Sequence, residues 1–173
     1  VALALREHPR LNSTLVEEEI VFLDEINVGV AVALEDGLIV PVVHGAHEKS
    51  VLAIHQEMRA LAEAARAGTL SVDEVTGGTF TISNLGAYGV ESFTPILNQP
   101  EVAILGVGQI AREPGLIGDQ VVARSRMTLS LTIDHRVVDG VPGASFLQTV
   151  VRLLEQPALI FAGDGGGARG RDG

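Results

Sequence analysis

The first part of the chain contains short apolar runs that are typical of strands. Residues 20–23 and 28–34 are rich in β-branched side chains, and Glu35-Asp36-Gly37 is a hairpin turn signal that leads into residues 38–43. We therefore expect two neighbouring antiparallel strands in this region.

A helical period replaces these apolar runs after Ser50. Apolar side chains recur about every 3.6 residues, at Val51, Ile54, Met58, Leu61, Ala62 and Ala65. Ser50 is a suitable N-cap and Gly68 a suitable stop, so the pattern predicts an amphipathic helix. The capping-box pattern Ser71-Val-Asp-Glu74 predicts the start of a short second helix.

Strand patterns return in the second half of the chain. Gly77-Gly78 precedes a predicted strand at 79–83, and a Gly-punctuated loop of the kind that often carries function follows at 84–100. Three further strands are predicted at residues 102–107, 121–123 and 127–133, with Arg124-Ser-Arg126 as the turn between the last two.

A final helix is predicted from about Asp139 or Gly140 to Pro157. Its expected core-facing side carries Ala144, Leu147, Val151 and Leu154. Strands interrupted by a few helices, without regular strand-helix-strand alternation, predict a mixed α/β architecture in two layers.

The two ends of the sequence differ from the rest. Residues 1–9 lack an initiator methionine and an N-cap residue for a helix. Their apolar pattern is typical of the end of a helix. We expect a fragment in which residues 1–161 form one domain without its amino-terminal segment. Residues 162–173 are expected to be a flexible Gly-rich tail.

Composition narrows the range of functions. A formal net charge of −10 with a single lysine argues against binding nucleic-acid phosphates or a membrane surface. The absence of cysteine excludes disulfides, thiolate metal sites and a cysteine nucleophile. No apolar run approaches the roughly 20 residues of a membrane span and no signal-peptide pattern is visible, so an intracellular location is expected.

The segment Leu131-Thr-Ile-Asp-His135-Arg-Val-Val-Asp139-Gly140 carries the clearest candidate chemistry. It sets a histidine at the end of a strand and a carboxylate just before a helix. Imidazole, with an ordinary pKa of about 6.5, suits a general base that removes a proton from a thiol or hydroxyl. The alternative is structural, with Asp139 capping the helix.

Other candidates have stronger structural explanations. Gly106-Val-Gly108 resembles a dinucleotide fingerprint, but Pro114-Gly115 prevents the required helix, so close strand packing is preferred. His44, His47 and Glu48 match no zinc spacing, and a solvated loop without a metal is expected. Ser83 lacks a nucleophile elbow and suits an oxyanion donor better, with turn capping as its structural alternative.

Four segments together resemble the catalytic domain of the dihydrolipoamide acyltransferases, the core components of 2-oxo acid dehydrogenase complexes. They are Gly37-Leu-Ile-Val-Pro-Val-Val43, Gly77-Gly-Thr-Phe-Thr-Ile-Ser-Asn-Leu-Gly86, Pro95-Ile-Leu-Asn-Gln-Pro-Glu-Val-Ala-Ile-Leu-Gly-Val107 and Asp134-His-Arg-Val-Val-Asp-Gly140. The resemblance extends to about Phe161. It implies a chloramphenicol-acetyltransferase-like fold, a mixed sheet flanked by helices, assembled as a trimer with active sites between subunits.

The resemblance also implies roles for individual residues. His135 matches the catalytic histidine, Ser83 the hydroxyl that stabilises the tetrahedral intermediate, and Asp139 the polar position four residues after the histidine. Coenzyme A contacts are expected at Ser83, Leu85 and Gly86. His135 of one subunit should face Ser83 of its neighbour, and no metal is required.

The implied reaction moves an acyl group between dihydrolipoamide and coenzyme A, with the lipoyl group carried on a domain absent from this chain. The implied partners are lipoyl domains, a thiamine-dependent 2-oxo acid dehydrogenase and dihydrolipoamide dehydrogenase, around trimers assembled into a cage. The compartment would be the bacterial cytoplasm or, in a eukaryote, the mitochondrial matrix. Two alternatives remain: transfer to a small hydroxyl or amine acceptor, and a non-catalytic structural core. The resemblance does not decide whether the acyl group is acetyl, succinyl or branched-chain. The sequence of residues 84–90 favours acetyl.

Overall fold

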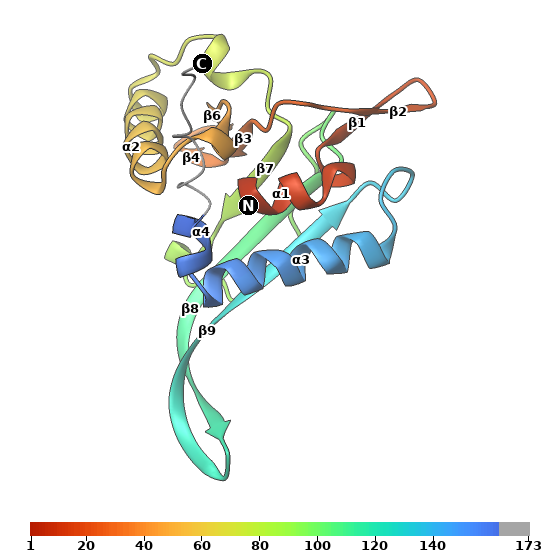
Figure 1. The fold of residues 1–173 in the computed structure, drawn as a ribbon. Helices are drawn as coiled ribbons and strands as arrows, with labels where there is room; N and C mark the ends of the chain where they lie inside the picture. Colours follow the sequence, from red (N-terminus) through yellow and green to blue (C-terminus); the bar gives the residue numbers. More distant parts are fainter. Residues whose placement is uncertain (163–173) are drawn as a thin grey trace, which may run out of the picture.

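A five-stranded mixed sheet forms the centre of the computed structural model, which describes residues 1–162 (Figure 1). Its strand order is β6-β3-β7-β8-β9. The strands are β3 (Val28–Val30), β6 (Val42–Val43), β7 (Phe80–Asn84), β8 (Ala103–Ile117) and β9 (Gln120–Ile133). β7 pairs in parallel with β3 and β8, whereas β6 and β9 run antiparallel to their neighbours.

Helices α1 (Ala2–Glu7) and α3 (Gly140–Glu155) pack together against the sheet (Figure 1). The ring of Phe146 lies 5.4 Å from that of Phe80 and 5.9 Å from that of His8, measured between centroids. His8 also hydrogen-bonds the hydroxyl of Thr149 at 2.8 Å. The most deeply buried apolar residues of this core include Leu5, Leu11, Phe80, Leu105, Val138 and Phe146.

The remaining elements surround this core. They are two small antiparallel ribbons, β1 (Ser13–Val16) with β2 (Glu19–Phe22) and β4 (Val32–Leu34) with β5 (Gly37–Ile39); helices α2 (Val51–Ala67) and α4 (Ala158–Ala162); and 3₁₀ turns at Pro9–Leu11, Ala46–Glu48, Asp73–Val75 and Gly86–Tyr88. None of the helices within residues 1–162 combines the length and apolar character needed to cross a membrane. The expected tail lies almost entirely outside the described residues.

Several predictions from the first half of the chain are confirmed. The antiparallel pair exists as two ladders, β3 with β6 and β4 with β5. Helix α2 begins after Ser50, whose hydroxyl accepts a hydrogen bond from the amide of Ala53, and ends at Gly68 with a φ of 67°. The strand predicted at 79–83 is β7.

The prediction for Ser71-Glu74 is only partly confirmed. The segment forms a 3₁₀ turn rather than a helix. The carboxylate of Glu74 accepts hydrogen bonds from the amide and hydroxyl of Ser71, both at 2.8 Å, and these bonds lower the pKa of Glu74. The capping interaction therefore forms without a helix behind it.

The strands predicted at residues 102–107, 121–123 and 127–133 are confirmed apart from Val102, but the turn predicted at 124–126 is wrong and the strands are longer than predicted. β8 continues through Pro114 to Ile117, and β9 passes through the predicted turn at 124–126 without interruption. Beyond β7 the two strands form a ribbon with free edges, where proline needs no ladder partner and arginines reach water.

The core-facing side predicted for the last helix is also wrong, because the buried positions lie one residue before the predicted ones. Phe146, Val150 and Leu153 are buried, whereas Val151 and Leu154 are exposed. Apolar residues occur on more than one side of α3, since Val141 is exposed as well. The period could therefore predict a helix but could not choose its buried side.

Candidate functional site

The loop between β9 and α3 is held firmly by its backbone. The amide of Asp134 donates to the carbonyl of Val102 at 2.8 Å, and the amides of Val137 and Val138 donate back to the carbonyl of Asp134 at 2.9 Å. Arg10 Nε donates to the carbonyl of Val137 at 2.6 Å. Because both valines are buried, the loop has one anchored side and presents its polar residues outward.

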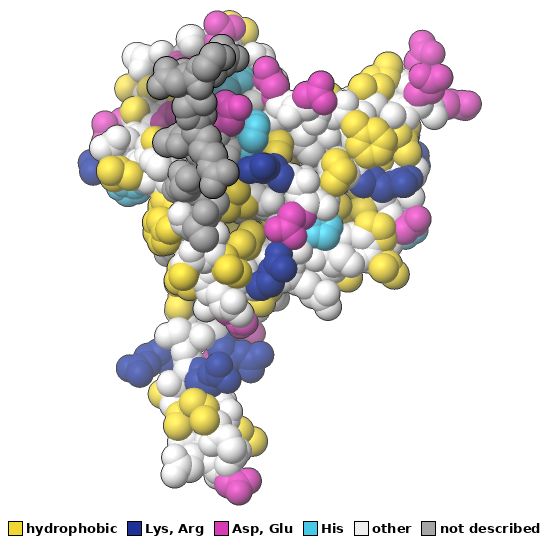
Figure 2. Space-filling view, in the orientation of Figure 1, with side chains coloured by type: hydrophobic (Ala, Val, Ile, Leu, Met, Phe, Trp, Pro, Cys, Tyr) yellow, Lys and Arg dark blue, Asp and Glu magenta, His cyan; other side chains and the backbone are white. Residues whose placement is uncertain are grey.

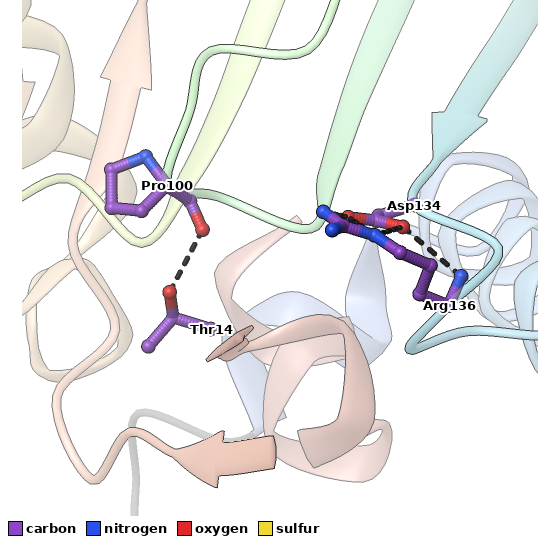
Figure 3. A network of polar contacts seen from close by, with 4 residues as sticks. All are labelled: Thr14, Pro100, Asp134 and Arg136. Atoms are coloured by element: carbon purple, nitrogen blue, oxygen red, sulfur yellow. Dashed lines mark hydrogen bonds and ion pairs between the residues drawn. The ribbon is translucent and has the colours of Figure 1, made fainter. Parts of the chain in front are cut away.

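Asp134 and Arg136 stabilise the same turn (Figure 3). The carboxylate of Asp134 accepts hydrogen bonds from the backbone amide of Arg136 at 3.0 Å and from its guanidinium at 2.5 to 3.1 Å. These contacts hold the pKa of Asp134 below its usual value. The residue between them is His135, so its backbone is fixed on both sides.

A second contact in Figure 3 ties the β1–β2 ribbon to the segment that leads into β8. The hydroxyl of Thr14 donates to the carbonyl of Pro100 at 2.9 Å, and Thr14 forms an isolated bridge with Glu101. The root of β1 and the His135 loop therefore lie on the same edge of the molecule, joined through residues 100–102.

His135 and Asp139 point into solvent and toward each other. Their side chains are 76% and 75% exposed, and His135 Nδ1 lies 3.6 Å from Asp139 Oδ1. Asp139 occupies the N-cap position of α3 with extended backbone, but its side chain makes no capping hydrogen bond. The structural alternative, side-chain capping by Asp139, is therefore wrong in this structure, and the carboxylate lies within ion-pairing distance of the imidazole.

Ser83 lies far from His135 within one chain. Ser83 pairs with Gly106, Gly106 pairs with Ser130, and Ile133 lies three residues further along β9. At about 3.4 Å per residue and 4.8 Å between strands, the Cα atoms of Ser83 and Ile133 are roughly 14 Å apart. His135 lies beyond Ile133, so the structure does not bring the two candidate catalytic side chains together in one copy.

The other two candidate coenzyme A residues form a turn against β8. The amide of Leu85 donates to the carbonyl of Val107 at 3.1 Å, and the amide of Gly86 donates to the side chain of Asn84 at 2.9 Å. A Cβ atom at Gly86 would lie 2.5 Å from the carbonyl oxygen of Gly108. Packing against β8 therefore requires glycine at position 86, independently of any contact with coenzyme A.

The preferred use of Gly106 and Gly108 in close strand packing is confirmed. A Cβ atom at Gly106 would lie 3.1 Å from the ring of Phe93, and one at Gly108 would lie 2.0 Å from the carbonyl oxygen of Glu91. Both glycines stand within β8, so no helix follows them as a dinucleotide site requires.

The solvated loop expected at His44 and His47 is partly wrong. His44 Nε2 contacts the carbonyl oxygen of Asp73 at 2.9 Å, while His47 Nδ1 is buried and has no hydrogen-bond partner. Within residues 1–162, no group of three or more His, Cys, Asp or Glu side chains is placed to hold a metal ion.

One titratable residue near the site escaped the sequence analysis. Glu101 is 5% exposed, and burial raises its pKa to about 7. Its Oε1 accepts a hydrogen bond from Asn98 at 3.2 Å, while Oε2 is buried without a partner. The feature of the sequence that could have indicated a buried carboxylate is the position of Glu101 directly before the apolar residues that begin β8.

Comparisons with known proteins agree with this geometry. Residues 1–162 match the family described as 2-oxoacid dehydrogenases acyltransferase (catalytic domain). The chain is 46% identical over 159 residues to the dihydrolipoyllysine-residue acetyltransferase component of the acetoin cleaving system of Bacillus subtilis (strain 168). That match covers 92% of this chain and 40% of the relative, so the chain spans about two fifths of the length of such curated relatives.

Solved structures are similar over the same residues. Dihydrolipoamide acetyltransferase from Azotobacter vinelandii has a TM-score of 0.88 at 39% identity, covering 92% of this chain and 68% of that one. It was investigated for the catalytic roles of a serine, a histidine 52 residues later and an asparagine 4 residues after that histidine. The cubic core of a pyruvate dehydrogenase multienzyme complex has a TM-score of 0.87 at 40% identity, covering 91% of this chain and 65% of that one.

A more distant structure confirms the predicted fold class. Chloramphenicol acetyltransferase has a TM-score of 0.58 at 16% identity, covering 88% of this chain and 73% of that one. Identity at this level shows the fold alone. The mixed α/β sheet flanked by helices is thus the chloramphenicol-acetyltransferase-like architecture expected from the sequence.

Proposed function

Because the chain belongs to the family of 2-oxoacid dehydrogenase acyltransferase catalytic domains, we propose that it moves an acyl group between dihydrolipoamide and coenzyme A. The main support for the proposal is the spacing of three residues along the chain. Ser83, His135 and Asp139 stand 52 and 4 residues apart, as do the serine, histidine and asparagine investigated in the Azotobacter enzyme. An aspartate replaces the asparagine here, and either side chain has an oxygen that can accept a hydrogen bond from an imidazole N–H.

The proposed reaction begins with His135 as general base. A thiol with an ordinary pKa of about 8.5 is mostly protonated at neutral pH, so its proton must be removed before it attacks. His135 takes that proton from coenzyme A, and the thiolate attacks the carbonyl carbon of the acyl-dihydrolipoamide thioester. His135 then returns the proton to the departing lipoyl sulfur, which leaves as a thiol.

Ser83 and Asp139 support this step in different ways. The hydroxyl of Ser83 donates a hydrogen bond to the oxyanion of the tetrahedral intermediate. Asp139, 3.6 Å from His135 Nδ1, orients the ring for proton transfer. Leu85 and Gly86, in the turn that follows Ser83, are proposed to border the coenzyme A path.

The separation of Ser83 from His135 within one chain supports an active site formed between copies. His135 of one copy would face Ser83 of a second, which the trimer implied by the family provides. Trimers would assemble into a cage around which lipoyl domains, the thiamine-dependent dehydrogenase and dihydrolipoamide dehydrogenase gather through other parts of the protein. Since the curated relatives are bacterial acetyltransferases, we propose acetyl as the acyl group and the cytoplasm as the compartment.

Replacing His135 with alanine tests the role of the base. Turnover between acetyl coenzyme A and dihydrolipoamide should fall by roughly 10²- to 10⁴-fold. His55→Ala, which removes an exposed histidine on α2, should leave turnover unchanged. Full activity of the His135→Ala protein would reject the general-base assignment.

The choice of acceptor is tested separately. Wild-type protein should transfer acetyl to dihydrolipoamide in preference to small hydroxyl or amine acceptors. A preference for a hydroxyl would favour the alternative acyltransferase. Coenzyme A binding without any transfer by the full-length protein would instead indicate a structural core.

A further inference from the structure

The side chains of the proposed catalytic pair receive little support from the rest of the chain. His135 and Asp139 are 76% and 75% exposed, and neither belongs to the hydrophobic core. Their separation of 3.6 Å therefore depends on the backbone between them, which is the loop at residues 134–139. A residue that holds this backbone can position the pair without touching a substrate.

Contacts within the loop fix its buried side. The amides of Val137 and Val138 both donate to the carbonyl of Asp134 at 2.9 Å, and the two valines are 2% and 0% exposed. The carbonyl of Val137 takes no part in these contacts. It stands midway between His135 and Asp139, two residues from each, so the direction of its peptide group affects the placement of both side chains.

Arg10 binds this carbonyl from outside the loop. Its Nε donates to the carbonyl of Val137 at 2.6 Å, across 127 residues of sequence. Within residues 1–162, Arg10 is the only residue outside the loop whose side chain hydrogen-bonds it. Basic side chains lie over this loop at the right of the view in Figure 2. A charged donor makes a stronger hydrogen bond than a neutral one, so the contact can restrain the peptide group.

Arg10 extends from a rigid base. It lies in the 3₁₀ turn Pro9–Leu11 between α1 and β1, and its carbonyl accepts a hydrogen bond from the hydroxyl of Ser13 at 2.8 Å. Leu11 and Ser13 are both 0% exposed. Because the core fixes the backbone that follows Arg10, its guanidinium can hold the loop in place.

The bond to Val137 also accounts for the placement of the Arg10 side chain. Arg10 is exposed, and in the part of the chain that the structure describes its side chain makes no ion pair and no second hydrogen bond. The contact therefore joins the turn after α1 to the centre of the His135 loop and serves no other visible network.

We propose that Arg10 is a positioning residue for acyl transfer, whose bond to the carbonyl of Val137 keeps Asp139 beside His135 in the same chain. The proposal rests on the function proposed above and assigns Arg10 no contact with either substrate. A displacement of about 1 Å at the reacting groups can lower turnover by about 10²-fold. Loss of the bond should therefore lower kcat and leave substrate binding unchanged.

Two substitutions of similar length test the bond in the full-length protein. The amide nitrogen of Arg10→Gln stands as many bonds from the backbone as the Nε of arginine and still donates, whereas Arg10→Met has no donor. With acetyl coenzyme A and dihydrolipoamide, kcat should fall at least about tenfold in Arg10→Met and stay within about threefold of wild type in Arg10→Gln. Each KM should stay within about twofold of wild type.

Three results would overturn the positioning role. They are wild-type turnover in Arg10→Met, equal losses in the two variants, and a raised KM with wild-type kcat, which would indicate substrate binding. Arg6→Ala is the matched control, because it removes an exposed arginine of α1 with no side-chain hydrogen bond or ion pair among the described residues. Its turnover should equal that of wild type, and circular dichroism checks that every variant is folded.

A double-mutant cycle tests whether Arg10 acts through Asp139. Asp139→Ala removes the acceptor beside His135, so adding Arg10→Met should lower turnover by less than about twofold more. Losses that multiply would show that the two residues act independently and would reject the proposed route.

Hydrogen exchange separates failure of the positioning role from failure of the function. The amides of Val137 and Val138 should exchange at least about threefold faster in Arg10→Met than in wild type, whether or not acyl transfer occurs. An inactive wild-type protein with this change in exchange would reject the proposed function although the contact holds the loop. Wild-type exchange with full turnover in Arg10→Met would reject the positioning role and retain the function.

Discussion

At the scale of single residues, two carboxylates in similar sequence settings have opposite environments. Asp139 is exposed and lies 3.6 Å from the imidazole of His135. Glu101 is buried, with one oxygen unpartnered, and its pKa is raised to about 7 because burial disfavours the charged form. We therefore propose a role for Asp139 in the chemistry and one for Glu101 in the pH dependence of stability.

Asp139→Ala separates a catalytic role from a helix-capping role. Replacing a working N-cap with alanine costs about 0.5 to 2 kcal/mol, but the Asp139 side chain makes no capping bond. The free energy of unfolding in urea should therefore change by less than about 0.5 kcal/mol, while turnover falls because the hydrogen-bond acceptor beside His135 is lost. A large loss of stability with normal turnover would show that Asp139 acts as a cap.

Glu101→Gln tests the buried carboxyl group. The folded-state pKa of about 7 is above the ordinary value of 4.5, so folding favours the protonated form. The stability associated with this group is present in full below about pH 4.5 and is lost as pH rises through about 7. At about 1.36 kcal/mol per pKa unit, the loss is on the order of 3 kcal/mol.

Glutamine mimics the neutral carboxyl group and does not titrate. The stability of wild type relative to Glu101→Gln, measured by urea unfolding, should fall as pH increases from 5 to 8. Parallel pH profiles for the two proteins would show that Glu101 is charged in the folded state.

At the scale of elements, local pattern decided which segments are helical or extended, and packing decided which side is buried. In α3 the period of apolar residues predicts the helix correctly but predicts that Leu154 is buried. In the structure Leu154 is 51% exposed, whereas Leu153 is 8% exposed. In the part of the β8–β9 ribbon beyond β7, Pro114 and the pair Arg124 and Arg126 suggest interruptions, yet the free edges of a two-stranded ribbon accept them.

The adjacent leucines of α3 provide a matched comparison. Leu153→Ala should lower the free energy of unfolding by about 2 to 5 kcal/mol, as expected for a buried leucine. Leu154→Ala should cost less than about 1 kcal/mol in the separated subunit because its side chain is largely solvated. Thermal or urea denaturation of the two variants under dissociating conditions measures the difference, and equal losses would contradict the assigned buried side.

At the scale of the whole molecule, the proposed active site is incomplete in one chain. In the register of the sheet Ser83 is level with Ser130, and His135 lies five residues further along the chain, so the proposed catalysis requires a second copy.

Mixing two inactive variants tests the shared site. His135→Ala and Ser83→Ala proteins should each have low activity alone. After dissociation and reassembly together, about a quarter of the interfaces should join an intact histidine to an intact serine. Activity should then rise toward about a quarter of the wild-type value, and a mixture no more active than the mean of its components would place both residues in one subunit.

The sequence alone determined the family, the fold class and the identity of His135, Ser83 and Asp139 as candidates, because those depend on residue types at fixed spacings along the chain. It also determined α2 and β7, whose periods and caps are local. Only the tertiary structure decided the buried side of α3, the continuity of the β8–β9 ribbon, the burial of Glu101 and the distance between Ser83 and His135. Each of these depends on strand register and on what packs against a residue, and neither is encoded in the local pattern.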